Sequence, residues 1–300
     1  MEHLKGQTRR LQAVLEVMRP WHYGKNLLVF VPLFFSGQLF SNPQALRSAC
    51  MGFVAMSLTA SGIYAINDCA DAQQDRKHAV KRLRPVASGR ISPGGAKALA
   101  AALLCMAGAP LAAGLFSPAG AFCWAIYVAM NVGYSALGWK NRPIWDVTIV
   151  ALGFVLRILY GAELTGTPAS KWLLLTVLTG SYYMALGKRR TELNGGGQSV
   201  RTVLGLYTRE FLDRGMQMFL TLTVVFYTLW SVDDQTAARH LYGYTVCTVP
   251  VVILWVLHYS LNIEKNGWGD PVEVILHDRK LLGLGAAYVA LMFCLIYAKG

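Results

Sequence analysis

Charged side chains are scarce in this chain, and their scarcity excludes a soluble globular enzyme. Only 15% of the 300 residues are Asp, Glu, Lys or Arg, whereas soluble domains typically carry about 25%. Hydrophobic residues make up 54%, and they recur in runs long enough to cross a bilayer, which takes about 20 residues. We therefore expect an all-α, polytopic protein of the inner (plasma) membrane.

Recognisable metal-site and disulfide patterns are also missing. The six cysteines are scattered without a CxxC pair, and the six histidines form no HExxH arrangement, so neither zinc chemistry nor a disulfide framework is expected. The net charge of +12 lies in short loops between apolar runs rather than on a soluble module. Membrane topology explains it better than nucleic-acid binding does.

Nine apolar segments are predicted to be transmembrane helices of one membrane domain covering residues 1–300. If the N-terminus is cytoplasmic, 23 of the 28 Lys and Arg residues fall on the cytoplasmic side, which predicts an N-terminus inside and a C-terminus outside. The predicted spans are 24–41, 46–66, 95–116, 119–138, 144–164, 170–187, 211–231, 241–262 and 281–298.

The acidic residues gather where the second predicted span ends. Asp68, Asp71 and Asp75 follow one another at i, i+3 and i+7, so a continuing helix places all three carboxylates on one stripe. Three adjacent like charges repel each other, and Mg²⁺ commonly joins one or two carboxylates to substrate phosphates. The spacing predicts a cytoplasmic metal site, against the plainer interpretation of a solvated loop between two helices.

Basic side chains follow these acids directly, and they suit the binding of phosphate oxygens. They are Lys77, His78, Lys81, Arg82 and Arg84. A second polar loop, after the sixth span, contributes Lys188, Arg189 and Glu192. The plainer explanation for this second group is a basic helix end that obeys the positive-inside bias. We expect the two loops together to enclose a metal–diphosphate.

Single residues near the cytoplasmic ends of other spans complete the predicted site. Asp146 begins the fifth span, and Tyr134 and Lys140 precede it. Arg157 lies eleven residues after Asp146, deep in the same span, where a charge indicates either function or a structural pair with a neighbouring helix. Lys25 is either an interfacial anchor or a contact for an anionic substrate. Asp270, Glu273 and Asp278 suggest a lid or a capped helix start.

These motifs resemble a known family. Asn67 with Asp68, Asp71 and Asp75 reproduces the NDxxDxxxD motif of the UbiA superfamily of intramembrane prenyltransferases. RPWHYGKNLLVFVPLFF, NVGYSALGWK, GKRRTEL and GDPVEVILHDR resemble the decaprenyl-phosphate phosphoribosyltransferase branch over nearly the whole chain. The resemblance implies a nine-helix UbiA-like bundle with a cytoplasmic, magnesium-dependent site, with Mn²⁺ as a substitute.

The resemblance also implies the reaction. Phosphoribosyl diphosphate would donate 5-phosphoribose to a polyprenyl phosphate, such as decaprenyl phosphate, and release diphosphate. The product would be a lipid-linked precursor of cell-envelope pentose polymers. One departure from the superfamily agrees with this branch: the second aspartate-rich motif of the quinone and haem enzymes is replaced here by KRRTE, which offers cations to a donor carrying an additional 5-phosphate.

We assign roles on this basis. Asp68, Asp71 and Asp75 are predicted to be catalytic and, with Asn67, to hold the metal. The predicted substrate-binding residues are Lys25, Asn67, Lys77, His78, Lys81, Arg84, Tyr134, Lys140, Asp146, Lys188, Arg189 and Glu192. Two other functions remain open: a UbiA-type enzyme that transfers a prenyl group from prenyl diphosphate to an aromatic or other acceptor, and a membrane transporter. The oligomeric state is left open.

Overall fold

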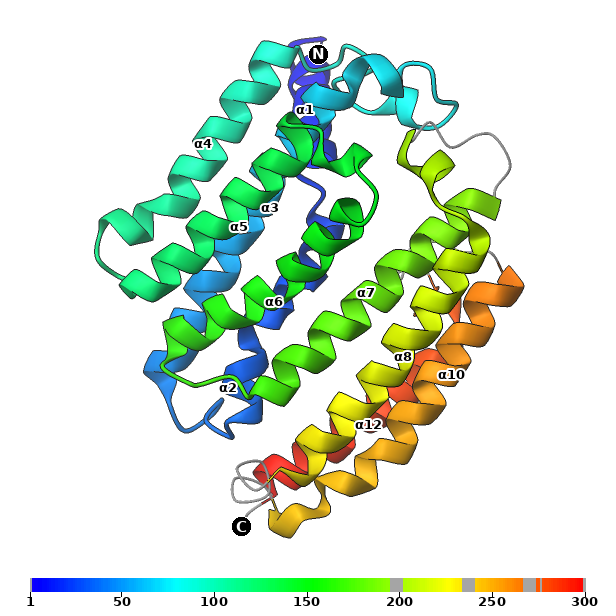
Figure 1. Cartoon of the computed structure of the whole chain (residues 1–300). Helices are drawn as coiled ribbons and strands as arrows, with labels where there is room; N and C mark the ends of the chain where they lie inside the picture. The colour runs from blue at the N-terminus through cyan, green and yellow to red at the C-terminus, as the bar shows by residue number, and fades with distance from the viewer. Residues whose placement is uncertain (1, 195–201, 234–240, 267–273, 276, 299–300) are drawn as a thin grey trace. The chain divides into compact units, whose positions relative to one another are not determined.

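The computed structural model describes residues 2–194, 202–233, 241–266, 274–275 and 277–298, and the regular structure within these ranges is entirely helical (Figure 1). The prediction of an all-α protein is therefore confirmed. The chain forms two compact units. The first comprises 1–33, 43–142 and 156–167, and the second comprises 34–42, 143–155 and 168–300.

The first unit is built around α3 (Pro43–Asp75). This helix contacts α4 and α5, and it also contacts α1 and the 3-10 helix η1. Met56 and Ile63 of α3 form a hydrophobic core with Val29, Tyr127 and Tyr160. The other helices of this unit are α1 (Glu2–Met18), η1 (Pro20–Phe30), η2 (Lys81–Leu83), α4 (Pro93–Ala112), α5 (Pro118–Ala136), η3 (Trp139–Asn141) and the second half of α6 (Trp145–Thr165).

The second unit contains the first half of α6 and most of the C-terminal half of the chain. Here α7 (Lys171–Asn194) lies along α8 (Arg209–Val232), and α12 (Arg279–Tyr297) contacts both η5 (Leu241–Thr248) and α10 (Val249–Asn266). The short helices α2 (Val31–Phe35) and η4 (Thr202–Leu206) complete the set. The core includes Tyr183, Leu212, Tyr259 and Leu281.

Several helices begin at a hydroxyl-bearing cap. The side chains of Ser92 and Ser117 accept the N–H of Gly95 at 3.1 Å and of Gly120 at 3.0 Å. A proline follows each serine as the first helical residue, where its missing N–H costs nothing and its φ suits the helix. The Ser-Pro dipeptides thus fix where α4 and α5 start.

Gly161 allows an unusually close approach within the first unit. A Cβ built on this residue of α6 would lie 2.0 Å from the carbonyl oxygen of Val29 in η1. Because the obstructing atom belongs to the backbone, no side-chain rotation relieves the clash. The absence of a side chain at Gly161 therefore sets the distance between α6 and η1.

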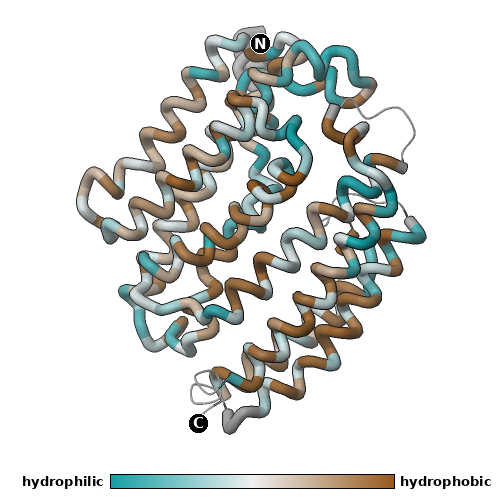
Figure 2. Tube along the Cα trace, viewed as in Figure 1, coloured by the Kyte–Doolittle hydropathy of each residue, from teal (hydrophilic) through white to brown (hydrophobic). Residues whose placement is uncertain are grey.

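The predicted number of nine spans is wrong for the described part of the chain, where six helices have the length and hydropathy of a span. Segment 24–41 is divided between η1 and α2. α5 and α7 are long helices that are not among these six, and α7 ends in the charged residues Lys188, Arg189, Arg190 and Glu192. Figure 2 shows hydrophobic residues along α8 and α10. The six spans are Pro43–Asp75, Pro93–Ala112, Trp145–Thr165, Arg209–Val232, Tyr244–Lys265 and Arg279–Tyr297.

Candidate active site

The last two turns of α3 carry the three predicted catalytic aspartates. The helix runs on without a break to Asp75, so Asp68, Asp71 and Asp75 share one stripe as their spacing predicts. Asp68 is 1% exposed and Asp75 is 5% exposed. The carboxylates are therefore not dispersed into solvent, and each needs a counter-charge inside the protein.

Each aspartate has a basic partner from a different segment of the first unit. Nη2 of Arg19 lies 2.5 Å from Oδ1 of Asp68, and Nη1 of Arg84 lies 2.7 Å from Oδ2 of Asp75. Lys140 forms an ion pair with Asp71, and its Nζ also donates to Oδ1 of Asn67 at 3.4 Å. Arg84 additionally lies 3.5 Å from Oδ1 of Asp68. Acids and bases thus form one alternating cluster.

Three predicted substrate-binding residues are therefore brought to the acids by the fold. Arg84 follows η2, which begins a few residues beyond the end of α3, and its backbone bonds to the carbonyl of Lys81. Lys140 lies in η3, directly after α5. Asn67 precedes Asp68 on α3 itself. The structure thus places Asn67, Arg84 and Lys140 beside the aspartates, and their contacts with a substrate stay predictions.

Arg19 is a member of the cluster that the sequence did not single out. Its backbone lies in the left-handed region with φ 52°, which is uncommon for a residue other than glycine. Its guanidinium carbon also lies 5.0 Å from the centre of the Tyr64 ring, a favourable cation–π geometry. Non-glycine residues in this region concentrate at functional sites, but no sequence pattern indicates a contact across 49 positions.

The donor set suits a divalent cation that prefers oxygen ligands. Oδ2 of Asp68 is buried and forms no hydrogen bond in the described part of the chain, and a buried unsatisfied carboxylate oxygen is costly. Further carboxylate oxygens of Asp71 and Asp75 and the amide oxygen of Asn67 lie on the same helix end. The described residues nevertheless contain no group of three acidic, His or Cys side chains already close enough to hold a metal. Arg19, Arg84 and Lys140 act as the counter-charges instead.

A second polar cluster lies in the second unit and is centred on Asp146, which is fully buried. Its Oδ2 accepts Nε–H of Arg189 at 2.6 Å, and Nη1 of Arg189 donates to Oε2 of Glu192 at 2.8 Å. These three predicted substrate-binding residues are thus found together. The plainer interpretation of the basic loop, a helix end satisfied by its own charges, explains neither the burial of Arg189 nor its pair with α6.

Tyr207 belongs to the same cluster, although no sequence pattern indicates it. Its hydroxyl donates to Oδ1 of Asp146 at 2.6 Å and accepts the N–H of Ile144 at 2.6 Å. Ile144 has φ 69°, an outlier for a β-branched residue. Burial raises the pKa of Tyr207, and the hydrogen bond to Asp146 raises it further. The phenol is therefore neutral and able to donate at physiological pH.

Other predicted site residues lie outside these two clusters. Lys77 is exposed just beyond α3, and Nδ1 of His78 accepts the backbone N–H groups of Val80 and Lys81 at 3.2 and 3.4 Å. His78 therefore stabilises the turn after α3. Lys25, Lys81, Tyr134 and Lys188 are partly buried, and their predicted contacts with a substrate stay predictions. Asp270 and Glu273 lie outside the described residues.

Arg157 is held inside the first unit. Its Nε donates to Oδ1 of Asn26 at 2.8 Å and its Nη2 donates to the hydroxyl of Tyr127 at 2.7 Å. Nδ2 of Asn26 in turn donates to Ser57 at 3.0 Å. The arginine is 7% exposed. These contacts support the structural interpretation of this intramembrane charge, since they connect α6, η1, α5 and α3.

Two bacterial proteins are similar to nearly the whole chain. A decaprenyl-phosphate phosphoribosyltransferase of Corynebacterium glutamicum is 33% identical over 290 residues, which cover 95% of this chain and 86% of the relative. The enzyme of the same name from Mycolicibacterium smegmatis is 33% identical over 300 residues, covering 96% and 93%.

Solved structures show the same fold. A UbiA homolog from Archaeoglobus fulgidus bound to GPP and Mg²⁺ matches with a TM-score of 0.72 at 18% identity, covering 95% of this chain and 99% of that one. The family model described as the UbiA prenyltransferase family matches residues 27–271. This chain belongs to the UbiA prenyltransferase family.

Proposed function

We propose that this chain is a magnesium-dependent polyprenyl-phosphate phosphoribosyltransferase, which also accepts Mn²⁺. It transfers 5-phosphoribose from phosphoribosyl diphosphate to a polyprenyl phosphate, decaprenyl phosphate or a similar lipid, and releases diphosphate. The observation that carries the proposal is the row formed by buried Asp68, partly buried Asp71 and buried Asp75, with its three basic partners. The names of the two bacterial relatives supply the donor and the acceptor.

The metal site would be formed by the carboxylates of Asp68, Asp71 and Asp75 with the amide oxygen of Asn67. A bound Mg²⁺ supplies Lewis-acid stabilisation of the negative charge that develops on the leaving diphosphate. Arg19, Arg84 and Lys140 already lie within contact of these carboxylates. We therefore expect their donors to contact the diphosphate oxygens on which charge develops.

The transfer needs little proton chemistry from the protein. The bond between C1 of the ribose and the diphosphate oxygen breaks, and the leaving diphosphate retains the electron pair. A phosphate oxygen of the lipid forms the new bond to C1 from the opposite face. Since the lipid phosphate is already ionised, the side chains chiefly bind and orient both substrates. We place the reaction on the cytoplasmic side, with the N-terminus inside and the C-terminus outside.

The test uses purified protein in detergent with labelled phosphoribosyl diphosphate and decaprenyl phosphate. We expect a lipid product whose mass exceeds that of the acceptor by one phosphoribosyl group. Asp68→Asn and Asp71→Asn should each abolish its formation while the protein stays folded. Glu16→Gln is the matched control, because this carboxylate of the first unit pairs with Arg90 at the surface, and it should retain activity.

The A. fulgidus homolog bound to GPP favours one alternative, the transfer of a prenyl group from prenyl diphosphate. The same preparation is therefore incubated with labelled geranyl diphosphate and an aromatic acceptor. Prenylated product, with no transfer from phosphoribosyl diphosphate, would replace the proposed donor and acceptor while leaving the metal site in place.

A further inference from the structure

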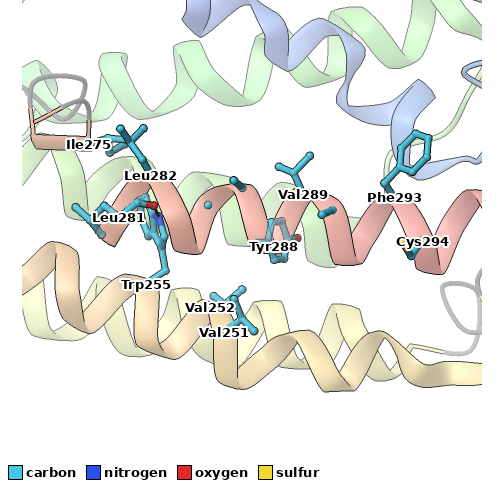
Figure 3. A pocket seen from close by; sticks show the side chains of 13 residues that line it. Val251, Val252, Trp255, Ile275, Leu281, Leu282, Tyr288, Val289, Phe293 and Cys294 are labelled. Atoms are coloured by element: carbon cyan, nitrogen blue, oxygen red, sulfur yellow. Dashed lines mark hydrogen bonds between the residues drawn. The ribbon is translucent and has the colours of Figure 1, made fainter. Parts of the chain in front are cut away.

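A long apolar groove runs between α10 and α12 in the second unit (Figure 3). Its volume is about 940 Å³, at the upper end of the range of small-molecule sites, roughly 300 to 1,000 Å³. Trp255, Val251 and Val252 face it from α10, while Leu282 and Val289 contribute from α12. Hydrocarbon dominates the lining, so the groove suits an apolar ligand.

The few polar atoms of the lining already have partners. Nε1 of Trp255 donates to the carbonyl of Leu281 at 3.2 Å, and the Tyr288 hydroxyl lies 3.2 Å from that of Tyr227. A ligand in the groove therefore gains from the burial of apolar surface and not from hydrogen bonds. This property fits a hydrocarbon chain.

The groove extends along most of α12. Its lining on this helix runs from Leu281 to Cys294, which corresponds to about 20 Å at 1.5 Å per residue. The hydrocarbon core of a bilayer is about 30 Å thick. One extended chain can thus follow the groove through much of the apolar layer.

Two cations mark one end of the groove. Arg279 and Lys280 are exposed at the start of α12, and neither forms an ion pair with another described residue. The neighbouring Asp278 accepts the N–H groups of Lys280 and Leu281 at 2.7 and 3.3 Å and Nδ2–H of Asn262 at 2.6 Å. His258 also lies 3.2 Å from this carboxylate. The aspartate is therefore engaged, whereas none of the described carboxylates pairs with Arg279 or Lys280, whose exposed side chains suit contact with an anion.

We propose that this groove binds the acceptor lipid, with its phosphate at Arg279 and Lys280 and its phosphate-proximal isoprenoid units along α12. This inference rests on the proposed function for the identity of the lipid. A cationic end followed by an apolar groove along one helix matches a phosphate that carries a long hydrocarbon chain.

Two alanines on α12 provide a matched test. Ala286 lines the groove, whereas its neighbour Ala287 does not, and both are exposed. Ala286→Phe should raise KM for decaprenyl phosphate about tenfold by filling the groove, while KM for phosphoribosyl diphosphate stays unchanged. Ala287→Phe should leave both values unchanged. If the two variants behave alike, the groove is not the acceptor site.

Acceptor length gives a second readout. Ala286 lies about 10 Å along α12 from Arg279, so dimethylallyl phosphate, whose single isoprene unit is too short to reach Ala286, should retain its KM in Ala286→Phe. The double variant Arg279→Gln with Lys280→Gln should raise KM for both acceptors. Equal impairment of dimethylallyl and decaprenyl phosphate by Ala286→Phe would contradict the proposed direction of the chain. If Ala286→Phe does not fold, Ala286→Leu serves the same purpose.

Native mass spectrometry separates this inference from the proposed function. Wild-type protein should retain added decaprenyl phosphate in preference to phosphatidylglycerol, and Ala286→Phe should lose that retention. Retention that depends on Ala286, without any transfer from phosphoribosyl diphosphate, would refute the proposed reaction and leave the groove assignment intact. Equal retention of phosphatidylglycerol would overturn the assignment in favour of ordinary membrane lipid.

Discussion

The hydroxyl of Tyr207 bridges Asp146 and the backbone N–H of Ile144, at 2.6 Å from each. It thus stabilises a fully buried carboxylate and an isoleucine in a strained backbone conformation. Tyr207→Phe removes one of the observed donors to that carboxylate, and hydrogen bonds to charged groups contribute about 1.5 to 3 kcal/mol. We expect a loss of stability of this size, measured by denaturant unfolding in detergent.

Tyr182→Phe is the control for this variant. The Tyr182 hydroxyl on α7 donates to Oγ1 of Thr148 at 2.9 Å, so the same atom is removed from a neutral pair whose acceptor, like Asp146, lies on α6. A loss of about 1 kcal/mol is expected. Equal losses in the two variants would show that the charge of Asp146 does not matter.

The pair of Asp146 and Arg189 predicts strong coupling between two substitutions. Arg189 is 4% exposed and Asp146 is fully buried, and removing one partner of a buried pair costs about 3 to 5 kcal/mol. Asp146→Asn and Arg189→Gln should each destabilise the protein by this amount. The double variant should recover part of the loss, which a double-mutant cycle measures; strictly additive losses would argue against the pair.

Arg19 predicts a link between metal binding and stability. Arg19→Gln removes one of the two described cations beside the buried carboxylate of Asp68. The other, Arg84, lies 3.5 Å away. We expect a lower melting temperature, and a smaller deficit when Mg²⁺ is added, because the ion replaces the missing charge. Arg90→Gln disrupts a pair with the partly exposed Glu16 and should change the melting temperature little. A deficit that Mg²⁺ leaves untouched would count against Asp68 as a metal ligand.

Gly161 predicts a steric limit. Gly161→Ala places a methyl group against the backbone of Val29 and should destabilise the protein by about 1 to 3 kcal/mol or more. Gly283→Ala meets no atom within 4 Å and should instead stabilise α12 by up to about 1 kcal/mol. Unfolding curves of the two variants should shift in opposite directions.

The spacing of neighbouring residues in the sequence predicted those parts of the site that lie on one helix or on the turn after it. The aspartate stripe follows from helical spacing, because α3 continues to Asp75. Arg84 reaches the same cluster only nine residues later, whereas Lys77 and His78 fall in the turn between them. Basic character alone could not distinguish Arg84 from these neighbours, since the path of the turn decides which side chain points back.

Long-range contacts explain most of what the sequence missed. Arg19 reaches Asp68 from 49 positions away, and Tyr207 reaches Asp146 from 61. No spacing rule relates such residues. The first predicted span failed for a different reason: hydropathy detects an apolar segment but does not show that η1 and the five-residue α2 divide it.

The internal counter-charges of the three aspartates bear on how the protein is made. Many small metal-binding domains remain unfolded until their ion arrives. Here Arg19, Arg84 and Lys140 neutralise the acids within the same unit. If these acids bind magnesium as proposed, we expect a newly synthesised chain to insert and fold before the ion is captured, so that its production would not depend on the cellular supply of the ion.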